Sequence, residues 1–192
     1  MKSLAVIRNE HRSLGAALFC LKRLVEQEEN GKHTDFKECH GLLLYIDRFL
    51  DRYHHPKENE YLFPAVLKRN PDLAPTIEEL VRQHQQGEKL IVVVLKTLSA
   101  FECTGQTEFQ NFKQTVEEYA SFEYEHAHKE EKEILPVAEK TLSEQDWSEI
   151  DAAFLDHQDP MFGDKPTAEF SELYRQIVSI VPAPLGLGEA WK

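Results

Sequence analysis

The sequence contains few residues that interrupt regular structure, and it has no long hydrophobic run. Its 8 glycines and 9 prolines make up about 9% of the 192 residues, below the roughly 12% usual in globular proteins. The longest aliphatic run, Leu90 to Leu95, has six residues, whereas about 20 are needed to span a bilayer. The scarcity of glycine and proline predicts long regular segments, and the short aliphatic run excludes a transmembrane helix.

Basic residues and cysteine pairs are also scarce. The 22 Lys+Arg residues against 34 Asp+Glu residues give a formal net charge of -12, which argues against a nucleic-acid-binding protein. The three cysteines, Cys20, Cys39 and Cys103, lie far apart, and this odd number suits reduced thiols better than disulfides. Charged residues appear from Arg8 to Arg12, before an apolar stretch of signal-peptide length has accumulated. We therefore expect a cytoplasmic protein with no nucleic-acid or membrane partner.

The sequence does contain four long stretches in which apolar residues recur every three or four positions, a pattern typical of amphipathic helices. These stretches run from Leu4 to Val25, from Phe36 to Leu62, from Ile77 to Leu98 and from Phe109 to Val137. Short connections cannot cross the length of a bundle, so they favour antiparallel neighbours. We predict an all-α protein built on an up-down-up-down four-helix bundle.

Helix-capping residues and helix breakers lie between these stretches. The predicted N-terminal caps are Asp35 for the second helix, Thr76 for the third and Thr107 for the fourth. Asn30-Gly31 and Thr104-Gly105 are expected to end the first and third helices, and the segment Asn70 to Pro75 the second.

Two additional C-terminal helices are expected after the bundle. One begins at Ser143-x-x-Asp146 and ends near His157, and the other runs from about Pro166 to Val181. We assign residues 1–140 to the bundle and 141–192 to a C-terminal helical extension packed on the same domain. The extension either covers one end of the bundle or forms the interface of a homodimer, and the sequence leaves both alternatives open.

Four of the nine histidines belong to an internal repeat. The pair His54-x-x-x-Glu58 recurs 72 residues later as His126-x-x-x-Glu130, and Pro64 recurs at the same offset as Pro136. His11 and His84, in the first and third stretches, are 73 residues apart. Each half of the bundle therefore supplies one lone histidine and one His-x-x-x-Glu pair.

This repeat favours a metal centre inside the bundle. Residues four apart on a helix project from the same face, so each pair directs an imidazole and a carboxylate into one space. A bundle interior cannot hold four histidines and two glutamates without charge compensation, and two divalent cations would supply it. Imidazole and carboxylate ligands suit iron, manganese or zinc, and the absence of thiolate ligands favours iron or manganese.

With these residues the sequence resembles the hemerythrin-like family, whose members carry the HHE cation-binding domain. The resemblance covers residues 1 to 140 and is carried by Asn9-Glu10-His11, by the segment from His54 to Pro64, by Gln83-His84, and by His126-x-x-x-Glu130 with Ile134-Leu135-Pro136. The segment Asp159 to Gly163 is similar to one that follows the bundle in bacterial members.

The resemblance implies a four-helix bundle that holds two non-haem iron ions and binds oxygen or reacts with related small oxidants. It implies that His11, His54, His84 and His126 are terminal ligands and that Glu58 and Glu130 bridge the metals. A symmetric allocation gives one iron His11 and His54 and the other iron His84 and His126.

One position departs from the oxygen-carrying hemerythrins. Those proteins have His-x-x-x-His on the third helix, whereas Glu88 lies four residues after His84 here. The centre therefore looks closer to family members that sense iron or oxygen, consume peroxide, or supply iron for the repair of iron–sulfur sites. We expect oxygen, peroxide or nitric oxide as the small ligand, and the sequence leaves enzymatic turnover undecided.

Three further residues are candidate ligands. His55 lies about 100 degrees around the helix from His54, so it either faces a neighbouring helix or adds a ligand if Pro56 distorts the backbone. Glu88 and Glu123 are predicted to lie on the inner side, about one turn from His84 and His126, where each is either an extra ligand or an acceptor for an imidazole N–H.

The alternatives to a redox or sensing di-iron protein come from other functional classes. One is an iron donor or store that exchanges metal with a client protein. Another is a metal-free helical adaptor, in which the histidines only pack and the acidic surface binds a basic partner. Bound metal would distinguish the redox protein and the iron donor from the metal-free adaptor.

Overall fold

The computed structural model describes residues 1–33, 35–155, 159–160, 168 and 171–180. Every regular element in this part of the chain is a helix, and it contains no strand. The all-α fold class predicted from the sequence is therefore confirmed. No helix of the described residues is long and apolar enough to cross a membrane.

Four long helical segments correspond to the four amphipathic stretches. The first is α1 (Lys2–Glu29), and the third is α5 (Ala74–Thr104), which follows the short 3-10 helix η3 (Pro71–Leu73). The second segment is divided into α2 (Phe36–Ile46), η1 (Asp47–His54), α3 (His55–Lys57), η2 (Glu58–Leu62) and α4 (Phe63–Arg69). The fourth is divided into α6 (Gln106–Lys129), η4 (Glu130–Ile134) and α7 (Leu135–Thr141).

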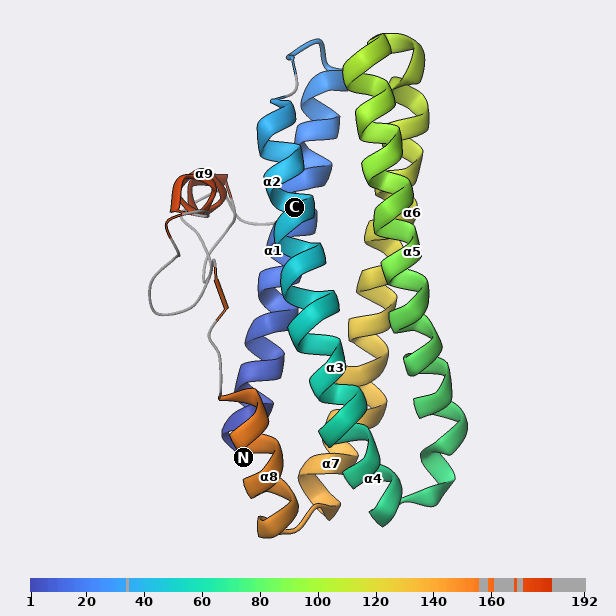
Figure 1. The fold of residues 1–192 in the computed structure, drawn as a ribbon, viewed down its shortest axis with the longest axis vertical. Coiled ribbons are helices and arrows are strands. Elements are labelled where there is room, and N and C mark those ends of the chain that lie inside the picture. The colour runs from blue at the N-terminus through green and yellow to red at the C-terminus, as the bar shows by residue number, and fades with distance from the viewer. Residues whose placement is uncertain (34, 156–158, 161–167, 169–170, 181–192) are drawn as a thin grey trace.

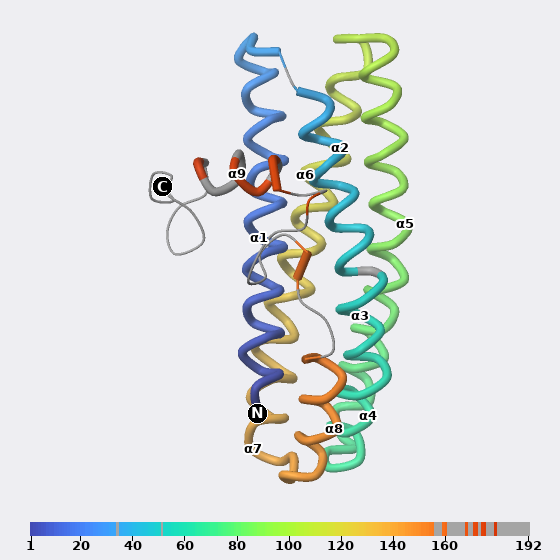
Figure 2. Tube along the Cα trace, turned by 60° about the vertical axis from the view of Figure 1, so that its left-hand side comes forward, coloured from blue at the N-terminus to red at the C-terminus, as the bar shows by residue number. Residues whose placement is uncertain are grey.

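These segments lie side by side along the long axis of the molecule (Figures 1 and 2). α1 contacts α2 and α6, and α5 contacts the same two helices. The contact between α5 and α6 is the most extensive. Each segment therefore has two neighbours around a shared interior.

The predicted helix ends are partly confirmed. Asp35 accepts hydrogen bonds from the backbone N–H groups of Lys37 and Glu38 at the start of α2. Gly31 follows α1 and Gly105 follows α5, and both have the positive φ that glycine adopts readily, 78° and 70°.

Two predicted N-terminal caps are wrong. α5 begins at Ala74, because η3 leads directly into it and Pro75 fits its first turn, so Thr76 lies inside the helix. α6 begins at Gln106, directly after Gly105, which places Thr107 inside its first turn. In both cases the preceding turn, and not a side-chain cap, determines where the helix begins.

The structure adds three π-helical turns that periodicity did not predict. η1 ends at His54, η2 begins at Glu58 and η4 begins at Glu130. η2 and η4 occupy positions 72 residues apart, so the internal repeat extends to the backbone. In η2 the Glu58 carbonyl accepts a hydrogen bond from the N–H of Phe63, the residue before Pro64. In η4 the Glu130 carbonyl accepts one from Leu135, the residue before Pro136. Proline has no N–H for the α-helical ladder, which favours a local shift of register at these sites.

The structure describes two helices after residue 141, in the region where two were predicted. Ser143 and Asp146 form the predicted capping box, but α8 (Glu144–Phe154) ends before His157, which lies outside the described residues. α9 (Ser171–Ile180) contacts α1 and α2, and the predicted ends at Pro166 and Val181 also lie outside them. α8 packs along α1 at the end of the molecule that holds Met1 (Figure 1).

The buried apolar residues form two separate clusters. The larger cluster includes Leu18, Ile46, Leu98 and Phe112, and the smaller one includes Ile7, Leu62, Leu80 and Ile134. Along each long segment, the predicted metal-binding positions fall between residues of one cluster and residues of the other. A polar layer therefore separates the two apolar cores.

Candidate metal centre

Six residues from four helical segments lie at the centre of the polar layer. Exposed fractions are between 0% and 7% for all of them: His11 on α1, His54 at the end of η1, Glu58 at the start of η2, His84 on α5, His126 on α6 and Glu130 at the start of η4. These are the six ligands predicted from the sequence, and the structure brings them together in one buried space.

The four imidazoles form two pairs. The Nε2 atoms of His11 and His54 lie 3.2 Å apart, and those of His84 and His126 lie 3.1 Å apart. Glu58 lies between the pairs, with one carboxylate oxygen 3.3 Å from His54 Nε2 and the other 3.5 Å from His84 Nε2.

Glu130 makes the corresponding contacts from the opposite segment. One oxygen lies 3.3 Å from His11 Nε2, and the other lies 3.6 Å from both His84 Nε2 and His126 Nε2. Two groups of ligand atoms result, each with atoms within 4.8 Å of one another: His11, His54, Glu58 and Glu130, and Glu58, His84, His126 and Glu130. Both glutamates belong to both groups.

The outer nitrogen of each imidazole faces an oxygen atom. His54 Nδ1 lies 2.6 Å from Glu10 Oε2, and His11 Nδ1 lies 3.1 Å from Glu131 Oε1. His84 Nδ1 lies 3.0 Å from Asn59 Oδ1, and His126 Nδ1 lies 3.0 Å from Gln83 Oε1. Because each of these oxygens is an acceptor, every Nδ1 carries a proton and donates a hydrogen bond outward. In the neutral imidazole the Nε2 lone pair then points inward.

The donor set fits bound cations. Four Nε2 lone pairs and four carboxylate oxygens converge on the same buried space, and none of the oxygens of Glu58 or Glu130 accepts a hydrogen bond within the described residues. Burying two unsatisfied carboxylates carries a large free-energy cost unless positive charge compensates it. Nitrogen and oxygen ligands without thiolate suit iron, manganese or zinc.

The pKa values of the clustered residues are shifted by burial and by the neighbouring carboxylates. Burial disfavours the charged imidazole, but the nearby carboxylates of Glu130 and Glu131 outweigh it and raise the pKa of His11 to about 9. Burial and the charge of Glu130 raise the pKa of Glu58. Burial lowers the pKa of His126 to about 4. Protons therefore supply part of the positive charge that the carboxylates require.

His55 is buried beside the second imidazole pair. Its ring stacks on that of His84, with the ring centroids 4.0 Å apart and the planes inclined by 13°. A ligand atom of His55 lies within 4.8 Å of those of His84 and His126. A metal ion lies close to the plane of the imidazole that binds it, and two nearly parallel stacked planes do not share such a point. In this geometry His55 packs against His84, a predicted ligand, and would need a ring rotation to bind an ion itself.

The two remaining glutamate candidates lie outside these groups. Glu88 is exposed on α5, so it is not on the inner side that the spacing predicted, and Gly87 occupies the buried position of that turn. Glu123 is buried on α6, and its carboxylate lies next to Gly87. This carboxylate fills the space beside Gly87, which has no side chain.

A pocket of about 540 Å³ opens on the surface and reaches His11 at the edge of the centre. It is open on one side, and among its lining residues are His11, Arg12, Tyr124, His128 and Glu131. His11 is the only one of the six clustered residues among them, so solvent approaches the centre along the α1 and α6 side.

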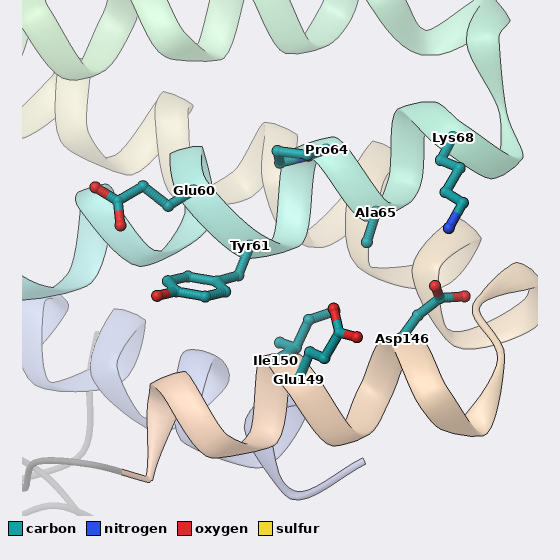
Figure 3. A pocket seen from close by; sticks show the side chains of 8 residues that line it. All are labelled: Glu60, Tyr61, Pro64, Ala65, Lys68, Asp146, Glu149 and Ile150. Carbon is teal, nitrogen blue, oxygen red and sulfur yellow. The ribbon is translucent and has the colours of Figure 1, made fainter.

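A second pocket, of about 200 Å³, lies between α4 and α8. Lys68 and Asp146 face one another at one end of it, with Tyr61 and Ile150 further along (Figure 3). None of the six clustered residues lines this pocket, so it is separate from the centre.

Sequence reasoning did not assign roles to the four oxygen-bearing partners of the imidazoles. Each is the chain neighbour of a clustered residue: Glu10 of His11, Asn59 of Glu58, Gln83 of His84 and Glu131 of Glu130. A neighbouring residue on a helix points about 100° away, toward the next helix, and there it meets a different imidazole. This adjacency was the signal available in the sequence.

The fold and this site together define a helical protein with a buried cation-binding centre made of histidine and glutamate. The family model of the hemerythrin HHE cation binding domain matches residues 2–138. The chain therefore belongs to the hemerythrin HHE domain family, and the predicted resemblance is confirmed. No curated protein and no solved structure gives a significant match.

Proposed function

We propose that this chain is a non-haem di-iron protein that binds or reacts with oxygen, peroxide or nitric oxide. The observation that carries the proposal is the buried convergence of four imidazole nitrogens on two carboxylates that belong to both groups of ligand atoms. His11 and His54 would hold one ion, His84 and His126 the other, and Glu58 and Glu130 would bridge them. Manganese or zinc in place of iron is compatible with the same ligands.

A bound pair of iron ions supplies the redox chemistry toward the small oxidant. The protein's own residues hold the site in the form that binds metal. Glu10, Glu131, Asn59 and Gln83 each accept a hydrogen bond from an imidazole Nδ1–H, which orients the ring and leaves its Nε2 lone pair for the ion. The apolar clusters above and below exclude water from the carboxylates.

The pocket beside His11 supports a small ligand. It gives a diatomic molecule or a peroxide a path from solvent to the edge of the centre. Glu88, which replaces the second histidine of the oxygen carriers, is exposed, so the second ion lacks the imidazole that those proteins have. This loss favours sensing or consumption of an oxidant over reversible oxygen carriage.

The proposal includes the wider organisation expected from the sequence. Residues 1–140 form an up-down-up-down four-helix bundle around the metals, and residues 141–192 form an extension with two helices packed on it. The acidic net charge and the lack of an apolar membrane-spanning helix in the described residues support a cytoplasmic location without nucleic-acid or membrane partners.

Metal analysis of protein purified without added metal or chelator tests the proposal. We expect close to two irons per chain and near-ultraviolet absorption typical of an oxo-bridged pair. Rapid loss of iron to an apo-protein acceptor, with no reaction toward peroxide or oxygen, would instead assign the chain as an iron donor. A colourless protein that binds no ferrous iron on reconstitution would contradict the proposal and favour the adaptor role.

A further inference from the structure

The outer hydrogen bonds of the centre differ between its two halves. The first pair of imidazoles, His11 and His54, donates to the carboxylates of Glu131 and Glu10. The second pair, His84 and His126, donates to the amide oxygens of Asn59 and Gln83. The six inner residues are arranged symmetrically, whereas the residues that accept from Nδ1 carry two negative charges beside the first pair and none beside the second.

A carboxylate and an amide act differently on the imidazole that donates to them. A carboxylate draws the Nδ1 proton toward itself and makes Nε2 a stronger electron donor to a cation. Its charge also attracts the cation directly, and the surrounding low dielectric preserves that attraction. An amide oxygen orients the ring to the same extent but brings no net charge.

Glu10 contributes more to this difference than Glu131. Glu10 is 3% exposed and lies 2.6 Å from His54, a short distance typical of a charge-assisted hydrogen bond. The Glu131 side chain is 43% exposed, its contact with His11 is longer at 3.1 Å, and Arg8 and Arg12 act on its charge. Solvent and these arginines weaken its effect on an ion.

Charge balance points to the same side. Two divalent ions carry four positive charges, and the shared Glu58 and Glu130 neutralise two of them. The two charges that remain can be balanced by Glu10 and Glu131, the carboxylates that contact an imidazole Nδ1, and both lie beside the first pair. The other buried carboxylate, Glu123, lies about one helical turn beyond His84 and His126, against Gly87. An ion between His11 and His54 is therefore more fully compensated than one between His84 and His126.

We propose that the two ion positions are unequal, and that the position between His11 and His54 binds a divalent cation first and more tightly. Glu10 is the positioning residue that creates most of the difference. The inference rests on the proposed di-metal function and adds an order of loading to it. The position between His84 and His126 is then the one that empties first when metal is limiting.

Crystals grown with one equivalent of Zn²⁺ test the order directly, because Zn²⁺ is redox-inert and its anomalous scattering locates it. We expect the main anomalous peak between His11 and His54. A main peak between His84 and His126, or two equal peaks, would overturn the inference. Crystals grown with excess Zn²⁺ should show two peaks, and the absence of any peak there would contradict the proposed function itself.

Two isosteric variants test the cause. Glu10→Gln keeps an acceptor for His54 Nδ1 and removes the charge, so we expect the affinity for the first Zn²⁺ to fall by roughly 10- to 100-fold. Asn59→Asp adds a charge beside His84, so it should raise the affinity for the second Zn²⁺. Glu131→Gln is the matched control, and its effect should be smaller than that of Glu10→Gln.

Stepwise affinities from competition with a chelator, together with circular dichroism to verify folding, provide the readout. In the Glu10→Gln/Asn59→Asp double variant the order of loading should reverse, and the peak at one equivalent should move to His84 and His126. Unchanged affinity for the first ion in folded Glu10→Gln would refute the role of Glu10.

Discussion

Gly87 on α5 leaves the space that the buried carboxylate of Glu123 on α6 occupies. A Cβ atom at position 87 would lie 2.7 Å from Glu123 Oε1, closer than real Cβ contacts. Glu123 is 1% exposed, so its carboxylate has little room to move away. A glycine three residues after His84 therefore has a packing role in the wall of the metal centre.

Replacing this glycine should destabilise the protein although alanine favours helices. In Gly87→Ala the new methyl group displaces Glu123, and we expect a loss of about 1 kcal/mol in the free energy of unfolding. The matched control is Gly15→Ala, where the Cβ meets Tyr124 at an ordinary 3.7 Å. Helix propensity should stabilise that variant by up to about 1 kcal/mol. Urea unfolding of the two variants tests the prediction, and equal stabilisation of both would contradict it.

Asp151 on α8 caps α1 from outside that helix. Its Oδ1 accepts hydrogen bonds from the Ser3 backbone N–H at 2.8 Å and from Ser3 Oγ at 2.6 Å. Asp151→Ala removes this cap and should lower the free energy of unfolding by about 1 kcal/mol at pH 7. Glu149→Ala, which removes an exposed carboxylate of the same helix, should change it by less than about 0.5 kcal/mol.

The effect of Asp151 should depend on pH. Burial alone would raise the pKa of Asp151, but the hydrogen bonds from Ser3 and from the backbone hold it well below its usual value. A depressed pKa in the folded state means that the stabilisation is complete above the unfolded-state pKa of about 3.9 and is lost as the pH falls toward the folded-state pKa. The difference between wild type and Asp151→Ala should therefore be smaller at pH 2 than at pH 7. An unchanged difference would show that the charge of Asp151 is not involved.

Phe154 on α8 covers the outer side of His54. It is fully buried, its ring meets that of His54 edge-on at 6.4 Å between centroids, and the Lys57 ammonium lies 5.6 Å from its centroid. Phe154→Ala should lower the free energy of unfolding by about 3 kcal/mol or more through the cavity it leaves. Leu155→Ala, at a position that is 50% exposed, should cost less than about 0.5 kcal/mol. Thermal unfolding separates the two, and similar effects would contradict the packing role of α8.

Removing one imidazole and one shared carboxylate should abolish metal binding. His126→Ala combined with Glu58→Ala deprives the second position of two ligands and the first of a bridging oxygen. We expect the metal content, measured by mass spectrometry, to fall from two ions per chain to none. His128→Ala, at an exposed position two residues away, should retain both ions. Full metal content in the double variant would refute the ligand assignment.

The helical segments and the clustered residues were predictable because both follow from spacing. Period-3.6 apolar residues determine which face of each helix is buried, and the 72-residue offset places His54 and His126 at equivalent depths. The starts of α5 and α6 were not predictable from Thr76 and Thr107, because a preceding turn can nucleate a helix without a side-chain cap.

The details around the imidazoles depend on tertiary packing, which spacing does not encode. The spacing of four placed Glu88 near His84, yet Gly87 takes the buried position and Glu88 is exposed. The contacts of His54 with Glu10 and of His11 with Glu131 join helices that are distant in the chain, and only the arrangement of the segments reveals them. The π-helical turns likewise shift the register where Glu58 and Glu130 must point inward.

The division of the apolar interior into two clusters has a consequence for how the molecule opens. In the smaller cluster the first turns of α1 pack against α4, α7 and α8. The larger cluster joins the opposite ends of the long segments. Between the two clusters lies a layer of buried imidazoles and carboxylates that lacks apolar packing. We therefore expect the two ends to behave as separate cooperative units in amide hydrogen exchange. Ions bound between the clusters would link the four segments there. The two ends would then unfold together in one cooperative transition.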